Sequence, residues 1–284
     1  MTAGAPITLN ETQYGDPSLP PLAFIHGLFG QGRNWTSTAK RAAKYFRVVL
    51  LDMPNHGRSG WTEHFEYLDQ AQIVVNHLLA LDRRPWRIVG HSMGGKIAML
   101  IALLRPGLVD RLVVVDMSPV RYDPPISDLR GYAQAMQAMD LSTLTGREDA
   151  DARLSSVVQD PGVRAFLLQN LRRADGSWSW QMNLDLLAAS MDNLGDWPDV
   201  TGRTDLPGKF EGPTLWVKGQ HSDYILDEYA PAMRTLFPAT RQVTIKNAGH
   251  WVHSEQPEVF RAVVRPFLGV PAFPEIEDDE PDVG

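Results

Sequence analysis

The sequence contains no cysteine. This absence excludes disulfide bonds, metal sites built from thiolates and a cysteine nucleophile. Long hydrophobic runs are missing too, since no apolar stretch approaches the roughly 20 residues that a helix needs to cross a bilayer. Residues 1–6 have neither the basic start nor the apolar stretch of a secretory signal. We therefore expect a cytoplasmic protein with no membrane partner.

Positive charge is scarce relative to negative charge. The chain has 27 Lys and Arg against 34 Asp and Glu, a net charge of −7. Because binding to phosphates needs a basic face, this balance argues against a nucleic-acid partner. Acidic residues are concentrated over residues 275–282, and we expect the tail over residues 271–284 to be disordered and solvated. The overall content of 43% hydrophobic and 21% charged residues is typical of a soluble globular protein.

Short apolar runs alternate with helical patterns in the first part of the chain. Runs at residues 22–25, 47–51 and 111–115 predict strands that are buried on both faces. Residues 67–81 and 96–104 have the apolar spacing of helices. This alternation predicts an α/β protein with a doubly wound, mostly parallel sheet. Reactive groups are then expected at the C-terminal ends of the strands, where open α/β sheets bind ligands.

The alternation stops over residues 120–206, which carry helical patterns rich in Met and Trp and no buried-strand run. The segments at residues 213–219 and 241–245 then predict two further strands of the sheet. A helical insertion after a strand end is a natural place for a lid that forms a substrate pocket. We therefore predict a core over residues 1–119 and 207–270, with a helical cap over residues 120–206.

The segment from Gly90 to Gly94 reads Gly-His-Ser-Met-Gly and lies between the apolar run 87–89 and the predicted helix. This G-x-S-x-G pattern between a strand and a helix indicates a nucleophile elbow. Such a turn holds its central residue in a strained conformation and presents the side chain above the sheet edge. The alternative interpretation is a structural turn, in a chain with 23 glycines. We predict that Ser92 is a nucleophile.

A serine hydroxyl attacks well only when a neighbouring base removes its proton. Histidine suits this task because its ordinary pKa lies near neutrality. The chain has eight histidines, of which His250 directly follows the last predicted strand and a glycine. His253 lies about one helical turn later. We predict that His250 is the base, and the alternative is a structural histidine.

Attack on an ester carbonyl develops negative charge on oxygen, which two backbone N–H groups can stabilise as an oxyanion hole. The elbow supplies one donor from the residue after the nucleophile, which here is Met93. The other donor comes from the loop that follows the strand at residues 22–25. We expect this donor to be Leu28, with Phe29 as the alternative.

A carboxylate is needed to hold the far nitrogen of the histidine in the correct tautomer. Asp116 follows the strand at residues 111–115, and Asp223 lies in the loop after the next strand. The chain order Ser, Asp, His fits both aspartates. Asp52 also follows a strand, but we expect its carboxylate to hydrogen-bond the backbone of its own loop. The residues alone leave both Asp116 and Asp223 open.

Five motifs occur in order at predicted strand ends: residues 26–30 (HGLFG), 52–57 (DMPNHG), 90–96 (GHSMGGK), 115–119 (VDMSP) and 249–253 (GHWVH). Together they resemble the α/β-hydrolase superfamily, over residues 22–268. Within it, the chain resembles the YbfF-type small carboxylesterases and their mitochondrial relatives.

The resemblance implies an α/β-hydrolase fold with a helical cap inserted after the strand that ends at Asp116. It implies a serine carboxylesterase that hydrolyses short- to medium-chain acyl esters, or thioesters, through an acyl-enzyme, without a metal or cofactor. In the wider superfamily the acid lies three residues after the glycine equivalent to Gly219, where this chain has Ser222. The YbfF-like branch resembles this arrangement, with its acid at the position of Asp116, so the resemblance favours Asp116 over Asp223.

Two other enzyme classes on this scaffold, carbon–carbon bond hydrolases and perhydrolases, share the Ser triad. A carbon–carbon hydrolase would need basic groups in the cap for an acidic diketone, and Arg130, Arg172 and Arg173 lie there. Epoxide hydrolases and haloalkane dehalogenases need a carboxylate nucleophile, which Ser92 is not. A non-catalytic ligand-binding receptor on the same scaffold is the alternative from outside enzymes.

Overall fold

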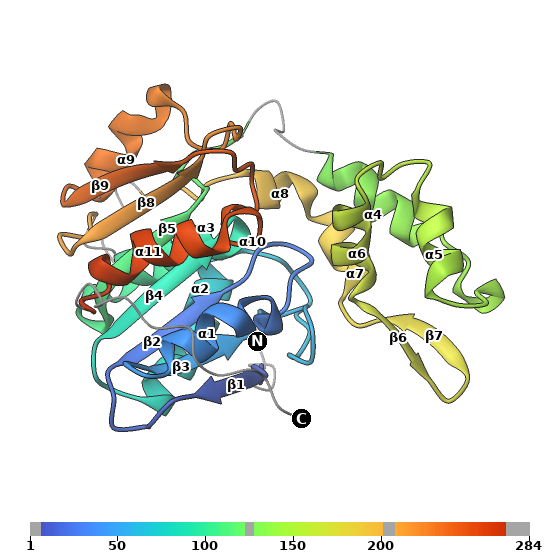
Figure 1. The fold of residues 1–284 in the computed structure, drawn as a ribbon, viewed down its shortest axis with the longest axis horizontal. Helices are drawn as coiled ribbons and strands as arrows, with labels where there is room; N and C mark the ends of the chain where they lie inside the picture. The colour runs from blue at the N-terminus through green and yellow to red at the C-terminus, as the bar shows by residue number, and fades with distance from the viewer. Residues whose placement is uncertain (1–6, 123–127, 201–207, 271–284) are drawn as a thin grey trace.

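The computed structural model describes residues 7–122, 128–200 and 208–270 (Figure 1). Within these ranges the main sheet has seven strands in the order β1-β3-β2-β4-β5-β8-β9. Strand β1 pairs antiparallel with β3, and all other neighbours in this sheet are parallel. The predicted doubly wound, mostly parallel sheet is therefore confirmed. The strands are β1 (Glu11–Tyr14), β2 (Pro21–Ile25), β3 (Arg47–Leu51), β4 (Trp86–His91), β5 (Val109–Val115), β8 (Thr214–Gly219) and β9 (Thr240–Ile245).

Two apolar layers cover the sheet. On one face α2 (Tyr67–Leu81) and α3 (Met93–Leu104) pack in one core cluster, and α3 is apolar almost all round because it is buried between α2 and the sheet. On the other face α1 (Thr36–Ala42) and α11 (Pro257–Phe267) pack in a second cluster. The remaining core elements are η1 (Gly32–Trp35), η2 (Pro106–Leu108), η4 (Asp227–Tyr229), α9 (Ala230–Leu236) and α10 (Val252–Glu255).

Strand order places two loops side by side. In the sheet, β3 is the neighbour of β2 on one side, and β4 is its neighbour on the other side. The loops that follow β2 and β4 therefore flank the point where the strand order reverses, which is where ligands bind in open α/β sheets. These are the loops that carry Leu28 and Ser92.

The helices between β5 and β8 lie to one side of the sheet in Figure 1, and we call residues 128–200 the cap segment. They confirm the helical cap that follows the strand ending at Asp116, whereas its boundaries at residues 120 and 206 stay a prediction. The acidic tail predicted over residues 271–284 lies outside the described residues. The cap elements are α4 (Leu129–Gln137), η3 (Leu141–Thr143), α5 (Arg147–Leu154), α6 (Pro161–Leu168), β6 (Leu171–Ala174), β7 (Ser177–Trp180), α7 (Leu184–Ala189) and α8 (Met191–Gly195).

The hairpin formed by β6 and β7 was not predicted from the sequence. Its two-residue loop is Asp175 and Gly176, whose φ angles are 50° and 80°. A hairpin loop with positive φ at both positions is a type I′ turn, for which Asp-Gly is a preferred pair. The strands themselves are only partly buried, so they lack the continuous apolar run that marks the strands of the main sheet.

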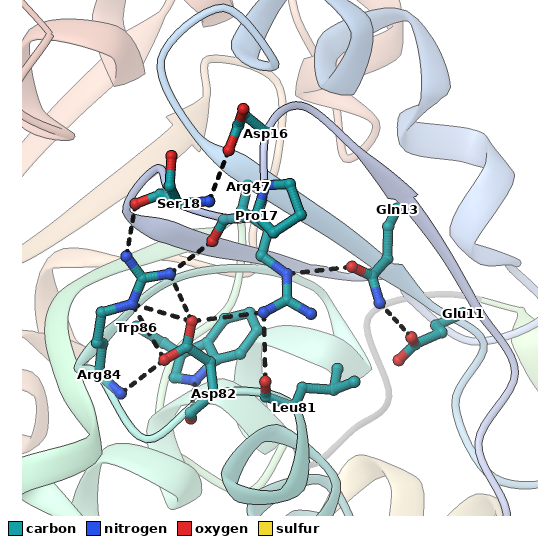
Figure 2. Close-up of polar contacts among 10 residues, drawn as sticks. All are labelled: Glu11, Gln13, Asp16, Pro17, Ser18, Arg47, Leu81, Asp82, Arg84 and Trp86. Atoms are coloured by element: carbon teal, nitrogen blue, oxygen red, sulfur yellow. Dashed lines mark hydrogen bonds and ion pairs between the residues drawn. The ribbon is translucent and has the colours of Figure 1, made fainter.

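A polar network ties the loops together near the start of β2 and β4 (Figure 2). Arg84 donates to the carbonyl oxygens of Ser18 at 2.7 Å and Pro17 at 2.8 Å, and pairs with Asp82 at 2.6 Å. Arg47 reaches the same carboxylate at 3.5 Å. The network therefore lies at the N-terminal ends of these strands, away from the end that carries Ser92. No helix among the described residues is long and apolar enough to cross a membrane.

Candidate active site

Ser92 lies at the junction of β4 and α3 with φ 53° and ψ −122°. Positive φ is rare for a residue with a side chain, and it costs free energy that the surrounding structure must supply. The two glycines of the motif allow the turn to pack tightly. A side chain at Gly90 would meet the Gly94 carbonyl oxygen at 2.3 Å, and one at Gly94 would meet the His26 carbonyl oxygen at 2.5 Å. This is the local geometry of a nucleophile elbow.

Asp116 and His250 are in direct contact, although 134 positions separate them in the chain. The His250 Nδ1–H donates to Asp116 Oδ2 at 2.8 Å. The Asp116 side chain is fully buried. Its other oxygen accepts from the Gly219 backbone N–H at 3.0 Å, and the Ser222 hydroxyl also donates to Oδ2. The carboxylate is thus held by three donors.

Asp223 and His253, the alternatives weighed from the sequence, lie elsewhere. Asp223 is exposed, and among the described residues no hydrogen bond or ion pair joins it to His250. The ring of His253 stacks on Trp35 with centroids 4.1 Å apart, and burial lowers the pKa of His253 to about 3. Asp116 is therefore the better placed acid, and His250 the better placed base.

Ser92 and the His250 ring are not hydrogen-bonded to each other among the described contacts. His91, next to Ser92 in the chain, connects the two loops: its Nε2–H donates to the His250 carbonyl oxygen at 2.9 Å. The two rings lie with their centroids 4.7 Å apart, and Tyr224 stacks on His250 at 4.1 Å. Without bound substrate, hydrogen bonds between nucleophile and base are often long and tighten in the complex.

The three candidate donors for the oxyanion hole differ in whether their backbone N–H is already hydrogen-bonded within the described part of the protein. Leu28 and Met93 line the same cavity as Ser92, and neither N–H donates to a protein acceptor among the described residues. The Phe29 N–H instead donates to His56 Nε2 at 3.2 Å. The geometry thus favours Leu28 over Phe29 as the partner of Met93.

Two buried histidines shape this loop, and the sequence reasoning gave them no role. His26 Nε2 accepts from the Met53 N–H at 2.9 Å, while His56 Nδ1–H donates to the Pro54 carbonyl oxygen at 3.0 Å. Burial lowers the pKa of both rings, to about 3 for His56. Both are therefore neutral at pH 7, as a ring must be to accept one hydrogen bond and donate another. The signal in the sequence that could have identified these two histidines was their position within the motifs that follow two neighbouring strands.

Asp52 directly follows β3, and its carboxylate was expected to hydrogen-bond the backbone of its own loop. Its Oδ1 accepts from the Gly32 N–H at 2.8 Å and its Oδ2 accepts from the Arg58 N–H at 3.0 Å. The prediction that this carboxylate bonds backbone groups is confirmed. It stabilises the loop that carries His56 rather than contacting His250.

Ser92 opens onto a cavity of about 170 Å³ between the core and the cap segment. Core residues on its wall include Leu28, Met93 and Met117, and the cap segment contributes residues of α4 and α8. This volume is below the ~300–1,000 Å³ of typical drug-sized pockets. The cavity is therefore suited to a small apolar group beside Ser92.

The three arginines considered from the sequence do not form one basic pocket. Arg130 lines the cavity, but it pairs with Asp192 at 2.6 Å. Arg172 donates to the Gln181 side chain, and Arg173 lies over the Trp178 ring, both within the β6–β7 hairpin. Arg121 also lines the cavity and lies 3.9 Å from the Asp196 carboxylate. Each of the two arginines on the cavity wall is thus paired with an aspartate.

The fold, the elbow and the Asp–His pair at the strand ends define the class of protein. The family described as alpha/beta hydrolase fold matches residues 20–257, so the chain belongs to the α/β-hydrolase fold family. The resemblance inferred from the five motifs is confirmed.

Similar proteins include esterases and lipases. The chain is 41% identical over 260 residues to the sn-1-specific diacylglycerol lipase ABHD11 of Mus musculus, covering 89% of this chain and 82% of that protein. It is 31% identical over 248 residues to the esterase YbfF of Escherichia coli, covering 87% and 92%. A solved marine microorganism esterase is 33% identical with a TM-score of 0.86, covering 92% of this chain and 99% of the other.

Proposed function

We propose that the chain is a serine carboxylesterase that hydrolyses short- to medium-chain acyl esters through an acyl-enzyme. The observation that carries the proposal is the hydrogen bond between the buried Asp116 carboxylate and His250, at the same end of the sheet as the strained Ser92. The similarity to YbfF and to the marine esterase supports ester hydrolysis.

In the first half of the reaction the Ser92 Oγ attacks the ester carbonyl carbon while His250 Nε2 takes its proton. Asp116 stabilises the imidazolium that forms. The N–H groups of Leu28 and Met93 donate to the negatively charged oxygen of the tetrahedral intermediate. The intermediate then collapses, and the alcohol leaves with the proton that His250 returns.

In the second half a water molecule attacks the acyl-enzyme carbonyl, with His250 again acting as base. The same two N–H groups stabilise the second tetrahedral intermediate. The carboxylic acid is released when the Ser92 Oγ recovers its proton. A thioester follows the same course with a thiol as the leaving group.

The cavity supports the choice of substrate size. Its wall is predominantly apolar, and its volume of about 170 Å³ leaves room for a short acyl chain rather than a long one. A carboxylate-bearing diketone would need an unpaired cation there, and both arginines on the wall, Arg121 and Arg130, pair with aspartates. Ester hydrolysis is therefore preferred over carbon–carbon bond cleavage.

Turnover of p-nitrophenyl esters from acetate to decanoate tests the function. We expect hydrolysis by the native chain with a preference for short to medium chains. Ser92→Ala should lower kcat by a factor on the order of 10⁶, because the nucleophile is lost. Comparable hydrolysis by Ser92→Ala would contradict the serine mechanism. A native chain that binds esters but turns over none would favour the receptor alternative.

A further inference from the structure

Lys96 is a buried lysine that the proposed reaction does not use. It lies one turn into α3, and its exposed fraction is 0%. Its backbone N–H donates to the Ser92 carbonyl oxygen at 3.2 Å. Because a buried ammonium costs free energy unless its N–H groups are bonded, the partners of its side chain indicate its role.

Those partners belong to the cap segment. Lys96 Nζ donates to the carbonyl oxygens of Gly195 at 3.0 Å and Asp196 at 2.5 Å, where α8 ends. The same ammonium lies 4.9 Å from the centre of the Tyr122 ring and 5.4 Å from that of Tyr67, within the range of cation–π contacts. The last carbonyls of a helix have no partner within the helix, so Lys96 supplies one from the core.

Two core residues bind the same turn. The Tyr67 hydroxyl donates to the Leu194 carbonyl oxygen at 2.9 Å. The Tyr122 N–H donates to the Gly195 carbonyl oxygen at 3.1 Å. Three consecutive carbonyls at the end of α8 are thus held by core groups, and Lys96 holds two of them.

This turn is also part of the cavity wall. Met191, Leu194 and Gly195 of α8 line the cavity that contains Ser92, together with Tyr67 and Tyr122. Lys96 does not line the cavity, so it acts from behind the wall. Because α3 begins directly after Ser92, the Lys96 side chain links the nucleophile's own helix to the wall that faces the substrate.

We propose that Lys96 is a positioning residue that holds α8 at a fixed distance from Ser92 and thereby sets the acyl-chain length that the cavity accepts. This inference rests on the proposed esterase function. Without the ammonium, only Tyr67 and Tyr122 still bond the last carbonyls of α8, while Asn193 of the same helix keeps its bond to the Phe65 carbonyl oxygen at 3.2 Å. The cavity can then deepen. Longer acyl chains then fit.

Lys96→Met tests the proposal because it keeps an unbranched side chain only one heavy atom shorter and removes every side-chain N–H donor. We expect the ratio of kcat/KM for p-nitrophenyl decanoate over butyrate to rise about tenfold, a change on the scale of pocket-length discrimination. The gain should come from KM for the long ester, with kcat for butyrate changing far less. Tyr67→Phe, which loses the bond to Leu194, should shift the ratio in the same direction by less.

Arg33→Met is the matched control. Arg33 also donates from a cationic side chain across the core–cap boundary, to the Gln169 carbonyl oxygen at 2.9 Å, but it does not line the cavity. Its ratio should equal that of the native chain. If kcat/KM in Lys96→Met falls equally for all acyl-chain lengths, or does not change, the ratio stays that of the native chain. That result would overturn the positioning role. Should Lys96→Met not fold, an unchanged ratio in Tyr67→Phe overturns it.

A separate readout distinguishes this inference from the proposed function. If the native chain hydrolyses no ester of the series, the esterase function fails, and amide hydrogen exchange over residues 191–197 then tests the tether. Faster exchange in Lys96→Met but not in Arg33→Met supports the link between α3 and α8. Equal exchange in the native chain and Lys96→Met overturns it.

Discussion

At the scale of single residues, the carboxylate that bonds His250 comes from Asp116, which is not at the position where the wider superfamily has its acid. Ser222 occupies the position where the resemblance to the wider superfamily places an acid, and its hydroxyl donates to Asp116. The loop after β8 thus contributes a hydrogen-bond donor, while the strand before the cap segment contributes the carboxylate. The Ser222 hydroxyl and the His250 Nδ1–H donate to the same carboxylate oxygen, Oδ2 of Asp116.

Separate substitutions of the two aspartates test the assignment of the acid. In Asp116→Asn the side chain can no longer hold His250 in the tautomer that accepts the Ser92 proton, so kcat should fall about 10⁴-fold. Asp223→Asn should leave turnover near that of the native chain, because Asp223 is exposed. Steady-state kinetics with p-nitrophenyl butyrate measure both. Near-normal turnover in Asp116→Asn with collapse in Asp223→Asn would reverse the assignment.

His56→Leu tests the support of the oxyanion loop. His56 Nε2 accepts the Phe29 N–H, and leucine removes that acceptor while keeping an apolar side chain in the site. We expect the neighbouring Leu28 N–H to shift and kcat to fall by about 10², the cost of a misplacement near 1 Å. Circular dichroism should show an intact fold. Unchanged kcat would mean that the loop does not depend on this bond.

Much of the site could be predicted at this scale because its chemistry requires particular residue types at strand ends. Ser92, His250 and Leu28 were named from such positions, whereas position left Asp116 and Asp223 both open and only the family resemblance favoured Asp116. The roles of these residues stay predictions for the experiments above. Lys96 could not be assigned, since it falls within an apolar helix and its partners lie about one hundred positions away. His26 and His56 were visible within motifs, but only the folded loops show which nitrogen bonds which neighbour.

At the scale of elements, the strands of the main sheet were predictable and the cap hairpin was not. Residues of β2 to β5 form apolar runs because both faces of the sheet are covered by helices. Strands β6 and β7 are half-exposed, and their sequence is dominated by charged, polar and Trp residues. The only strong local signal for them is the Asp175–Gly176 pair at the turn.

Gly176→Ala measures the contribution of that turn. The glycine has φ 80°, and a side chain there would meet nothing within 4 Å, so backbone strain is the only cost. We expect the free energy of unfolding to fall by about 1 kcal/mol. Gly107→Ala is the matched control, because its surroundings are equally open and its φ is not positive. Urea denaturation measures both, and equal stabilities of the two variants would contradict the expectation.

At the scale of the whole molecule, the boundary between core and cap segment contains a titratable group. Burial lowers the pKa of Lys96 to about 7, and the nearby Asp196 carboxylate only partly opposes this effect. The Tyr67 and Tyr122 rings also face the ammonium, but burial keeps both phenols neutral by raising their pKa values. Stability should therefore depend on pH through this boundary.

Between pH 7 and pH 10.5 the unfolded chain binds a proton on Lys96 that the folded chain has released. The free energy of unfolding therefore rises with pH across this window, by at most about 1.4 kcal/mol per pH unit. Below pH 7 both states bind the proton and this dependence ends. Lys96→Met should lack the rise, so we expect the native chain to gain stability relative to it from pH 7.5 to pH 9.5. Urea denaturation measures the free energy of unfolding of both proteins. A difference between them that stays constant from pH 7.5 to pH 9.5 would contradict this expectation.

The position of Asp116 also determines when activity can arise during folding. Its partners Gly219, Ser222 and His250 follow it by 103, 106 and 134 residues, across the whole cap segment. Contacts of such sequence separation form slowly, because a long loop must close before they stabilise anything. The return of esterase activity during refolding should therefore lag behind the return of helical circular dichroism. Activity would then report the pairing of β5, β8 and β9 as the late step in the assembly of the molecule.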